Sequence, residues 1–367
     1  MRRYFILFFL AFSSVCLSQE KNDVSSVFDI NFFSGNTAVH QPDVLHLVSG
    51  HPNGFIASWS KKTFGEEDWQ QRYNYPDYGI TLSYQDFNNP ILGENFGLYG
   101  HYSFYFLKRH LMLRLGQGIA YTTNAYDKIH NPKNIAYGSD LMGSTFIMIN
   151  YKKENLFKNF GLQAGLSLLH YSNANVKAPN TGINTIVANL GINYNLGNQE
   201  ENEYLYNIDE EKYTEPIKYN FQFASGVNQS DVVGSAQYPF YNFSFYADKR
   251  ISRKSAFQIG TELFISNFLK EFIRFRSIAY PEYGISGDED HKRISIFAGH
   301  ELFINRISII TQAGYYVYYP YEFEERGYIR LGLKHYFGQS RKIFASAAVK
   351  AHAFKAESAE FGIGVRL

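Results

Sequence analysis

The stretch FGLQAGLSLLHYSNANVKAPNTGINTIVANLGINYNL, from Phe160 to Leu196, decides the fold because apolar side chains alternate in it with small or polar ones. Alternation with a period of two is typical of β-strands, whose successive side chains point to opposite faces. We predict two strands joined by a polar loop. The apolar positions of the first strand end in His170 and Ser172, and Asn184 precedes the apolar series of the second. A base, a hydroxyl and an amide are therefore expected on the apolar face.

The composition of the 367-residue chain also favours short aromatic-rich strands over helices. It contains 30 Tyr, 33 Phe and 29 Gly, against 4 Met and 2 Trp, and aromatic residues are enriched in strands. The net charge of +1 gives no basis for a broad attraction to nucleic acid. The histidines lack zinc-ligand spacing and there is no phosphate-binding or dinucleotide motif, so we expect no metal and no cofactor.

Residues 1–18 have the pattern of a secretory signal peptide, with a basic start, a short apolar run from Phe5 to Phe12 and small residues before Gln19. Cleavage after Ser18 would remove Cys16, which is the single cysteine. A lipid-modified Cys16 is the alternative, but the residues before it are a poor lipoprotein signal. The mature chain is thus expected to fold without disulfides.

The remaining chain divides into alternating segments of about ten residues, the length of tilted membrane strands. Because a closed barrel satisfies every backbone group within a bilayer, we predict an all-β, antiparallel transmembrane β-barrel of about 14 to 16 strands. Short connectors such as Lys108-Arg109 interleave with long ones such as Asn124 to Asp140. The predicted strands begin near Val27, Gly54, Tyr78, Asn95, Leu111, Ser144, Phe160, Thr185, Ile217, Tyr241, Ala256, Arg293, Ile307, Tyr328, Ile343 and Glu360.

An acidic connector at residues 198–216 separates residues 19–197, which carry the candidate site, from a C-terminal half at residues 217–367. Parts of the two halves are similar, so the second half reads as a degenerate repeat, with His352 near the place of His170 and Phe354 in that of Ser172. Two tandem eight-stranded barrels are therefore the alternative. We favour one barrel, because the only free C-terminal strand ends at Leu367; pairing of Leu196 with the first strand would contradict this.

His170 and Ser172 are two residues apart on one strand and emerge on the same face. Serine needs an adjacent base to become a nucleophile, and a third group usually orients that base. Asn184 can accept a hydrogen bond from the imidazole. Candidate oxyanion donors in the polar loop are Asn173, Asn175 and Asn180. The alternative is that His170 and Ser172 only end a strand and form hydrogen bonds at the membrane boundary, which would give the same spacing.

The loop HYSNANVKAPNTGIN closely resembles the active-site segment of the lipid A deacylase (PagL) family, outer-membrane β-barrels that remove an ester-linked acyl chain from lipopolysaccharide. The family pattern is His-x-Ser-Asn, then Pro-Asn-x-Gly and an acidic residue two positions further. The resemblance implies His170 as general base, Ser172 as nucleophile and Asn180 as oxyanion donor. Asn184 stands in place of the acidic residue. The matching positions are His170, Ser172, Asn173, Pro179, Asn180 and Gly182.

The C-terminal half extends beyond the compact family barrel and is similar to extended acyloxyacyl-hydrolase-type relatives. The resemblance thus implies a serine esterase of the outer membrane that acts on lipid A, lipopolysaccharide or a similar glycolipid. Its expected partners are that substrate and the surrounding outer-membrane lipid, with no nucleic acid. A non-catalytic barrel, porin-like or structural, is the alternative. The sequence does not define an oligomeric state.

Overall fold

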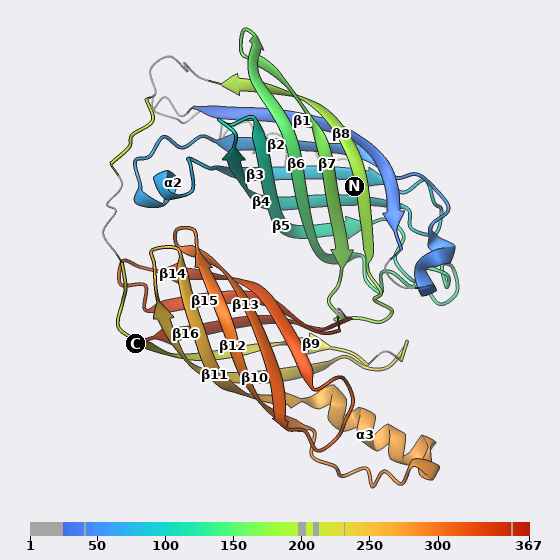
Figure 1. Cartoon of the computed structure of the whole chain (residues 1–367). Helices are drawn as coiled ribbons and strands as arrows, with labels where there is room; N and C mark the ends of the chain where they lie inside the picture. The colour runs from blue at the N-terminus through green and yellow to red at the C-terminus, as the bar shows by residue number, and fades with distance from the viewer. Residues whose placement is uncertain (1–24, 40–41, 197–202, 208–212, 231, 354) are drawn as a thin grey trace, which may run out of the picture.

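The computed structural model describes residues 25–39, 42–196, 203–207, 213–230, 232–353 and 355–367. Within them the chain forms sixteen strands in two closed antiparallel barrels, β1 to β8 and β9 to β16 (Figure 1). The prediction of an all-β, antiparallel barrel architecture is confirmed. The predicted signal peptide, Cys16 and Phe354 lie outside the described residues, as does part of the acidic connector.

Sixteen predicted strands match sixteen observed ones, and the largest difference in position is at β16, which begins at Lys355 rather than near Glu360. The first barrel consists of β1 Ser26–Ala38, β2 Asn53–Lys61, β3 Asp77–Asp86, β4 Glu94–Phe106, β5 Leu111–Thr122, β6 Leu141–Phe157, β7 Phe160–Ser172 and β8 Ile183–Leu196. The second consists of β9 Lys218–Asn228, β10 Tyr238–Arg250, β11 Ser255–Ser266, β12 Lys292–Phe303, β13 Ile307–Tyr318, β14 Gly327–Phe337, β15 Ile343–His352 and β16 Lys355–Arg366.

The preference for one large barrel is wrong, and the alternative of two tandem eight-stranded barrels is what the structure shows. Strand β8 pairs back to β1 from Ser26↔Leu196 to Ala38↔Asn184, and β16 pairs with β9. With eight strands in up-and-down order, the first and last run antiparallel and can share a full ladder of hydrogen bonds. Closure therefore needs two complementary edges, not the C-terminus of the chain.

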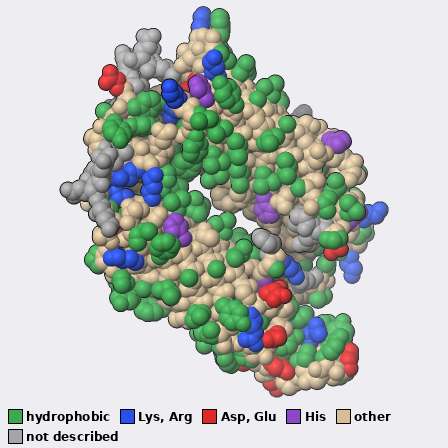
Figure 2. Space-filling view, in the orientation of Figure 1, with side chains coloured by type: hydrophobic (Ala, Val, Ile, Leu, Met, Phe, Trp, Pro, Cys, Tyr) green, Lys and Arg blue, Asp and Glu red, His purple; other side chains and the backbone are tan. Residues whose placement is uncertain are grey.

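The outer walls of both barrels are apolar. Large side chains such as Phe32, Leu190, Ile259 and Phe361 are each more than 60% exposed, and Figure 2 shows hydrophobic side chains spread over the visible walls of both barrels. The apolar parity predicted for β7 and β8 thus faces outward. Such a surface is incompatible with a water-soluble sandwich, whose apolar faces turn inward.

The barrel interiors hold polar and charged side chains instead. In the first barrel the buried Arg114 pairs with Asp29 at 2.8 Å. In the second, Arg330 binds both Glu262 and Glu360, and Lys334 binds Glu301 at 2.8 Å. Buried charges of this kind are tolerated because each is paired. The interiors are filled by side chains, as expected for barrels of eight strands.

The two ends of each barrel differ in the length of the connectors between their strands. The short β4–β5, β6–β7 and β12–β13 turns lie at the end that also holds the start of β1 and the end of β16; we call it the turn end. The opposite loop end carries the 3-10 helix η1 (Pro42–Leu47), the β5–β6 and β7–β8 loops, α3 (Asn267–Ala279) and η3 (Pro281–Tyr283). Helix α2 (Asp68–Arg72) is at the turn end, in the long β2–β3 connector. No helix among the described residues is long and apolar enough to cross a membrane.

Candidate functional site

The candidate site lies on the outer wall of the first barrel at its loop end, where β7 stops. Alternate side chains anchor the strand from inside: Leu169 and Tyr171 are fully buried, and the Tyr171 hydroxyl donates to Gln85 Oε1 at 3.1 Å. His170 and Ser172 therefore face outward and are partly exposed. Their predicted placement on the apolar side of the strand is the one observed.

His170 and Asn184 are direct cross-strand neighbours in the β7–β8 ladder. The His170 Nδ1 atom lies 2.7 Å from Asn184 Oδ1. Because an amide oxygen only accepts hydrogen bonds, Nδ1 carries the proton in this arrangement. Nε2 is then the unprotonated ring nitrogen, which is the state a general base requires.

The side-chain amide of Asn180 sits against the hydroxyl of Ser172. Asn180 Nδ2 lies 3.0 Å from Ser172 Oγ, and Asn180 Oδ1 accepts the backbone N–H of Asn173 at 2.9 Å. The backbone N–H of Ala174 points at Ser172 Oγ from 3.0 Å. Two N–H donors thus lie at the serine oxygen on the loop side, next to the place where the carbonyl oxygen of an attacked ester would gain negative charge.

Residues 173–182, here called the site loop, are held by a second loop of the same barrel. Asn173 Nδ2 donates to Ser139 Oγ at 3.1 Å and to Lys177 O at 2.7 Å. The backbone N–H groups of Thr181 and Gly182 donate to Ile135 O and Ala136 O. The β5–β6 loop therefore fixes both ends of the site loop.

The six predicted site residues do not all meet. His170 with Asn184, and Ser172 with Asn173 and Asn180, form two adjoining hydrogen-bonded groups. The side chain of Asn175 instead donates to Gln229 O in the second barrel at 3.0 Å. His352, near the place of His170 in the second half, is buried inside its barrel and binds Glu357 at 2.8 Å.

Gly182, one of the positions that match the family pattern, lies between the two groups. Its φ is +68°, and a Cβ atom there would come within 3.0 Å of Tyr171 O, 3.4 Å of Ser172 Cβ and 3.5 Å of His170 Cε1. Glycine adopts this backbone conformation without strain, and it leaves room for the Tyr171 carbonyl group between His170 and Ser172.

We therefore expect Gly182→Ala to reduce turnover at this site about fivefold, because the new methyl group comes within 3.0 Å of Tyr171 O and shifts the strand segment that carries His170 and Ser172. Gly284→Ala is the matched control, since Gly284 has a φ of +65° and open space around its Cβ position. It should share the backbone strain and keep full activity. Steady-state kinetics of both purified variants checks the prediction, and equal losses would contradict it.

A row of polar side chains continues the site across the outer wall. The register aligns Gln117 on β5 with Thr145 on β6, and Thr145 with His170 on β7. Thr145 Oγ1 donates to Gln117 Oε1 at 2.6 Å. We missed Gln117 and Thr145 in the sequence, although each is a polar residue in an otherwise apolar outward series. Together with His170 and Asn184 they form what we call the polar row.

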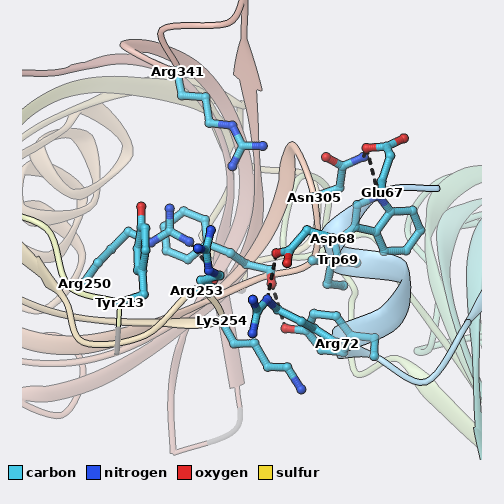
Figure 3. A pocket seen from close by; sticks show the side chains of 13 residues that line it. Glu67, Asp68, Trp69, Arg72, Tyr213, Arg250, Arg253, Lys254, Asn305 and Arg341 are labelled. Carbon is cyan, nitrogen blue, oxygen red and sulfur yellow. Dashed lines mark hydrogen bonds and ion pairs between the residues drawn. The ribbon is translucent and has the colours of Figure 1, made fainter. Parts of the chain in front are cut away.

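A cavity in the described part of the chain is remote from this site. It measures about 260 Å³ and lies at the turn end, between α2 of the first barrel and the turns of the second (Figure 3). Most of the charged side chains around it are cationic, namely Arg72, Arg250, Arg253, Lys254 and Arg341. His170 and Ser172 do not line it, since they face outward on the wall of the first barrel.

Comparisons with known proteins assign both halves of the chain. Residues 53–193 match the family model described as lipid A 3-O-deacylase (PagL). Residues 217–367 match the model described as the C-terminal domain of acyloxyacyl hydrolase. No curated protein matches in sequence.

Similar solved structures include the Acinetobacter baumannii outer membrane protein Omp33, with 6% identity, coverage of 94% of this chain and 100% of that one, and a TM-score of 0.19. A mutant of the Rh. blastica porin is 9% identical, with coverage of 93% and 100% and a TM-score of 0.21.

Proposed function

The chain belongs to the lipid A 3-O-deacylase (PagL) family, and on this basis we propose that it is an outer-membrane serine esterase that removes an ester-linked acyl chain from lipid A or a similar glycolipid. The observation that carries the proposal is the arrangement at the end of β7. His170 Nδ1 is hydrogen-bonded to Asn184, so Nε2 is left as the base, and N–H donors lie at the Ser172 hydroxyl. Both residues face the apolar outer wall. A buried active site would have to extract the acyl chain from lipid. At a site on the outer wall, the acyl chain of the substrate can stay in the bilayer.

In the first half-reaction, Ser172 Oγ attacks the ester carbonyl carbon while His170 Nε2 accepts the hydroxyl proton. The Oδ1 atom of Asn184 holds the ring through Nδ1 and keeps Nε2 directed away from that bond. The carbonyl oxygen becomes an oxyanion, which Asn180 Nδ2 and loop backbone N–H groups stabilise. The tetrahedral intermediate then collapses, the ester C–O bond to the sugar breaks, and the imidazolium gives its proton to the leaving sugar oxygen, which leaves the acyl group on Ser172.

In the second half-reaction, water attacks the acyl-serine and gives its proton to His170. The tetrahedral intermediate collapses, the fatty acid leaves as the carboxylic acid and loses its proton to solvent, and Ser172 recovers its proton from the imidazolium. Water can reach this point because the site lies at the rim of the wall beside the polar site loop.

The outer membrane is the location that best fits the surface. An exposed apolar wall around a polar interior is the arrangement of transmembrane barrels, whose short turns face the periplasm and whose longer loops face outward. The site at the loop end would then meet the outer leaflet, where lipopolysaccharide resides. The buried ion pairs inside both barrels weigh against the porin-like alternative, because they occupy the space a channel would need.

The polar row is suited to bind the glycolipid headgroup beside the scissile ester. We expect Thr145→Val, which keeps the shape but removes the hydroxyl that orients Gln117, to lower kcat/KM about fivefold through loss of roughly 1 kcal/mol of hydrogen bonding. The control is Thr261→Val on the outer wall of the second barrel. The Thr261 hydroxyl also makes one hydrogen bond, which it donates to Ser295 O at 2.8 Å. Identical kinetics for both variants would exclude Thr145 from substrate binding.

The proposed function is tested by mass spectrometry of lipid A from Gram-negative cells that express the wild-type chain or its Ser172→Ala and His170→Ala variants. We expect the loss of one acyl chain with wild type only, at equal amounts of folded barrel. Identical lipid A spectra for the three strains would reject the esterase.

A further inference from the structure

The β9–β10 loop of the second barrel, described at residues 229–230 and 232–237, binds the site loop from outside the first barrel. Gln229 Oε1 accepts the backbone N–H of Ala178 at 2.9 Å. The backbone N–H of Gln229 donates to Asn175 O at 3.2 Å, and Gln229 O accepts from Asn175 Nδ2 at 3.0 Å. A single residue thus makes three hydrogen bonds to the loop that carries the oxyanion donors.

Gln229 is itself held rigidly. It follows directly after β9, is 3% exposed, and its Nε2 atom donates to Ser235 O across its own loop. Gln237, at the other end of the loop, donates to Val176 O at 2.5 Å. The site loop therefore meets a surface that is fixed to a barrel wall, which limits its motion more than a contact with another free loop would.

The contact reaches Ser172 through a short covalent path. Ala178 is two residues before Asn180, whose side chain binds Ser172 Oγ and the Asn173 N–H. We propose that Gln229 is a positioning residue, and that the second barrel serves to hold the oxyanion loop against Ser172. This inference rests on the esterase function proposed above. It gives a role to the second barrel, whose described residues include no outward-facing counterpart of the site.

A second contact between the barrels lies at the turn end, far from the site loop, and provides a control for this role. The Tyr73 hydroxyl donates to Phe303 O at 2.7 Å, and Lys254 Nζ lies 4.4 Å from the centre of the Tyr73 ring. Burial raises the pKa of Tyr73 to about 12, so the hydroxyl keeps the proton that it donates. Figure 3 shows the cavity beside this contact. The barrels are therefore joined at both ends, and only the contact made by Gln229 reaches the site loop.

The test compares Gln229→Leu with Tyr73→Phe in the full-length protein. Each variant removes a side-chain hydrogen bond between the barrels, but only the first bond reaches the site loop. We expect Gln229→Leu to lower kcat about fivefold with KM within about twofold of wild type, because a displaced oxyanion donor acts on the transition state. Tyr73→Phe should keep both constants.

Gln229→Glu provides the rescue. A protonated carboxylic acid can accept from Ala178 and donate to Ser235 O as the amide does, whereas the carboxylate keeps only the first bond. Its kcat relative to wild type should therefore approach one at acidic pH and fall as the pH rises. A ratio that stays flat with pH, or Gln229→Leu with wild-type kcat, would overturn the inference.

Hydrogen exchange separates failure of this inference from failure of the proposed function. Whether or not the wild type cleaves lipid A, peptides covering residues 173–180 should exchange faster in Gln229→Leu than in wild type or Tyr73→Phe. Unchanged exchange in strand peptides of β7 and β9 shows that the barrels are folded. Equal protection of the site loop in all three proteins would reject the positioning role even if the enzyme is active.

Discussion

Ser172→Ala should lower the rate of acyl-ester cleavage by about 1,000-fold or more, which is the effect of removing the nucleophile from a serine–histidine pair. The remaining rate would come from the oxyanion donors and from binding alone. His170→Ala should cause a loss of similar size, because an unassisted serine hydroxyl is a weak nucleophile. The double variant should be no slower than either single variant, since each substitution disables the same step.

The measurement is single-turnover hydrolysis of a purified acylated glycolipid in detergent or liposomes. Ser167→Ala is the matched control on β7: Ser167 faces the interior and binds Asn189 Nδ2 at 3.0 Å. We expect it to retain activity, because its parity is opposite to that of Ser172. More than a tenth of wild-type activity in Ser172→Ala would assign the nucleophile to another residue, and strictly multiplicative losses in the double variant would argue against one shared step.

Much of the fold could be predicted because the sequence alternates apolar and small side chains almost everywhere it forms strands. The period of two placed His170, Ser172 and Asn184 on one face, and their shared hairpin made the His170–Asn184 pair predictable. Closure could not be predicted in the same way. It depends on how the edges of β1 and β8 match, and no local pattern in either strand reports this.

The contacts of the site loop were beyond sequence reasoning for a related reason. Gln229 is 51 residues from Ala178 and belongs to the other barrel, so no periodicity links them. Gln117 and Thr145 left a usable signal, because polar residues on a face that meets lipid are costly without a purpose. Their meeting with His170 still required the register of β5, β6 and β7.

Asn184 occupies the position where the family pattern has an acidic residue, so Asn184→Asp should increase kcat by about 10- to 30-fold. The amide already sets the ring orientation and tautomer through Nδ1, and only the charge is missing. A carboxylate at the same 2.7 Å distance would stabilise the imidazolium formed in each proton transfer. The gain follows from the difference of roughly 1.5–2 kcal/mol between a charge-assisted and a neutral hydrogen bond.

Two further variants show whether the gain acts through His170. Asn184→Leu removes the acceptor while filling similar space, and should lower kcat because the ring loses its orientation. Asn184→Asp combined with His170→Ala should be as slow as His170→Ala alone, since the carboxylate then has no imidazolium to stabilise. If Asn184→Asp left kcat unchanged while Asn184→Leu lowered it, orientation alone would be the contribution of this position. If neither changed kcat, Asn184 would be only a strand-end hydrogen-bonding residue, and the base would be oriented by another group.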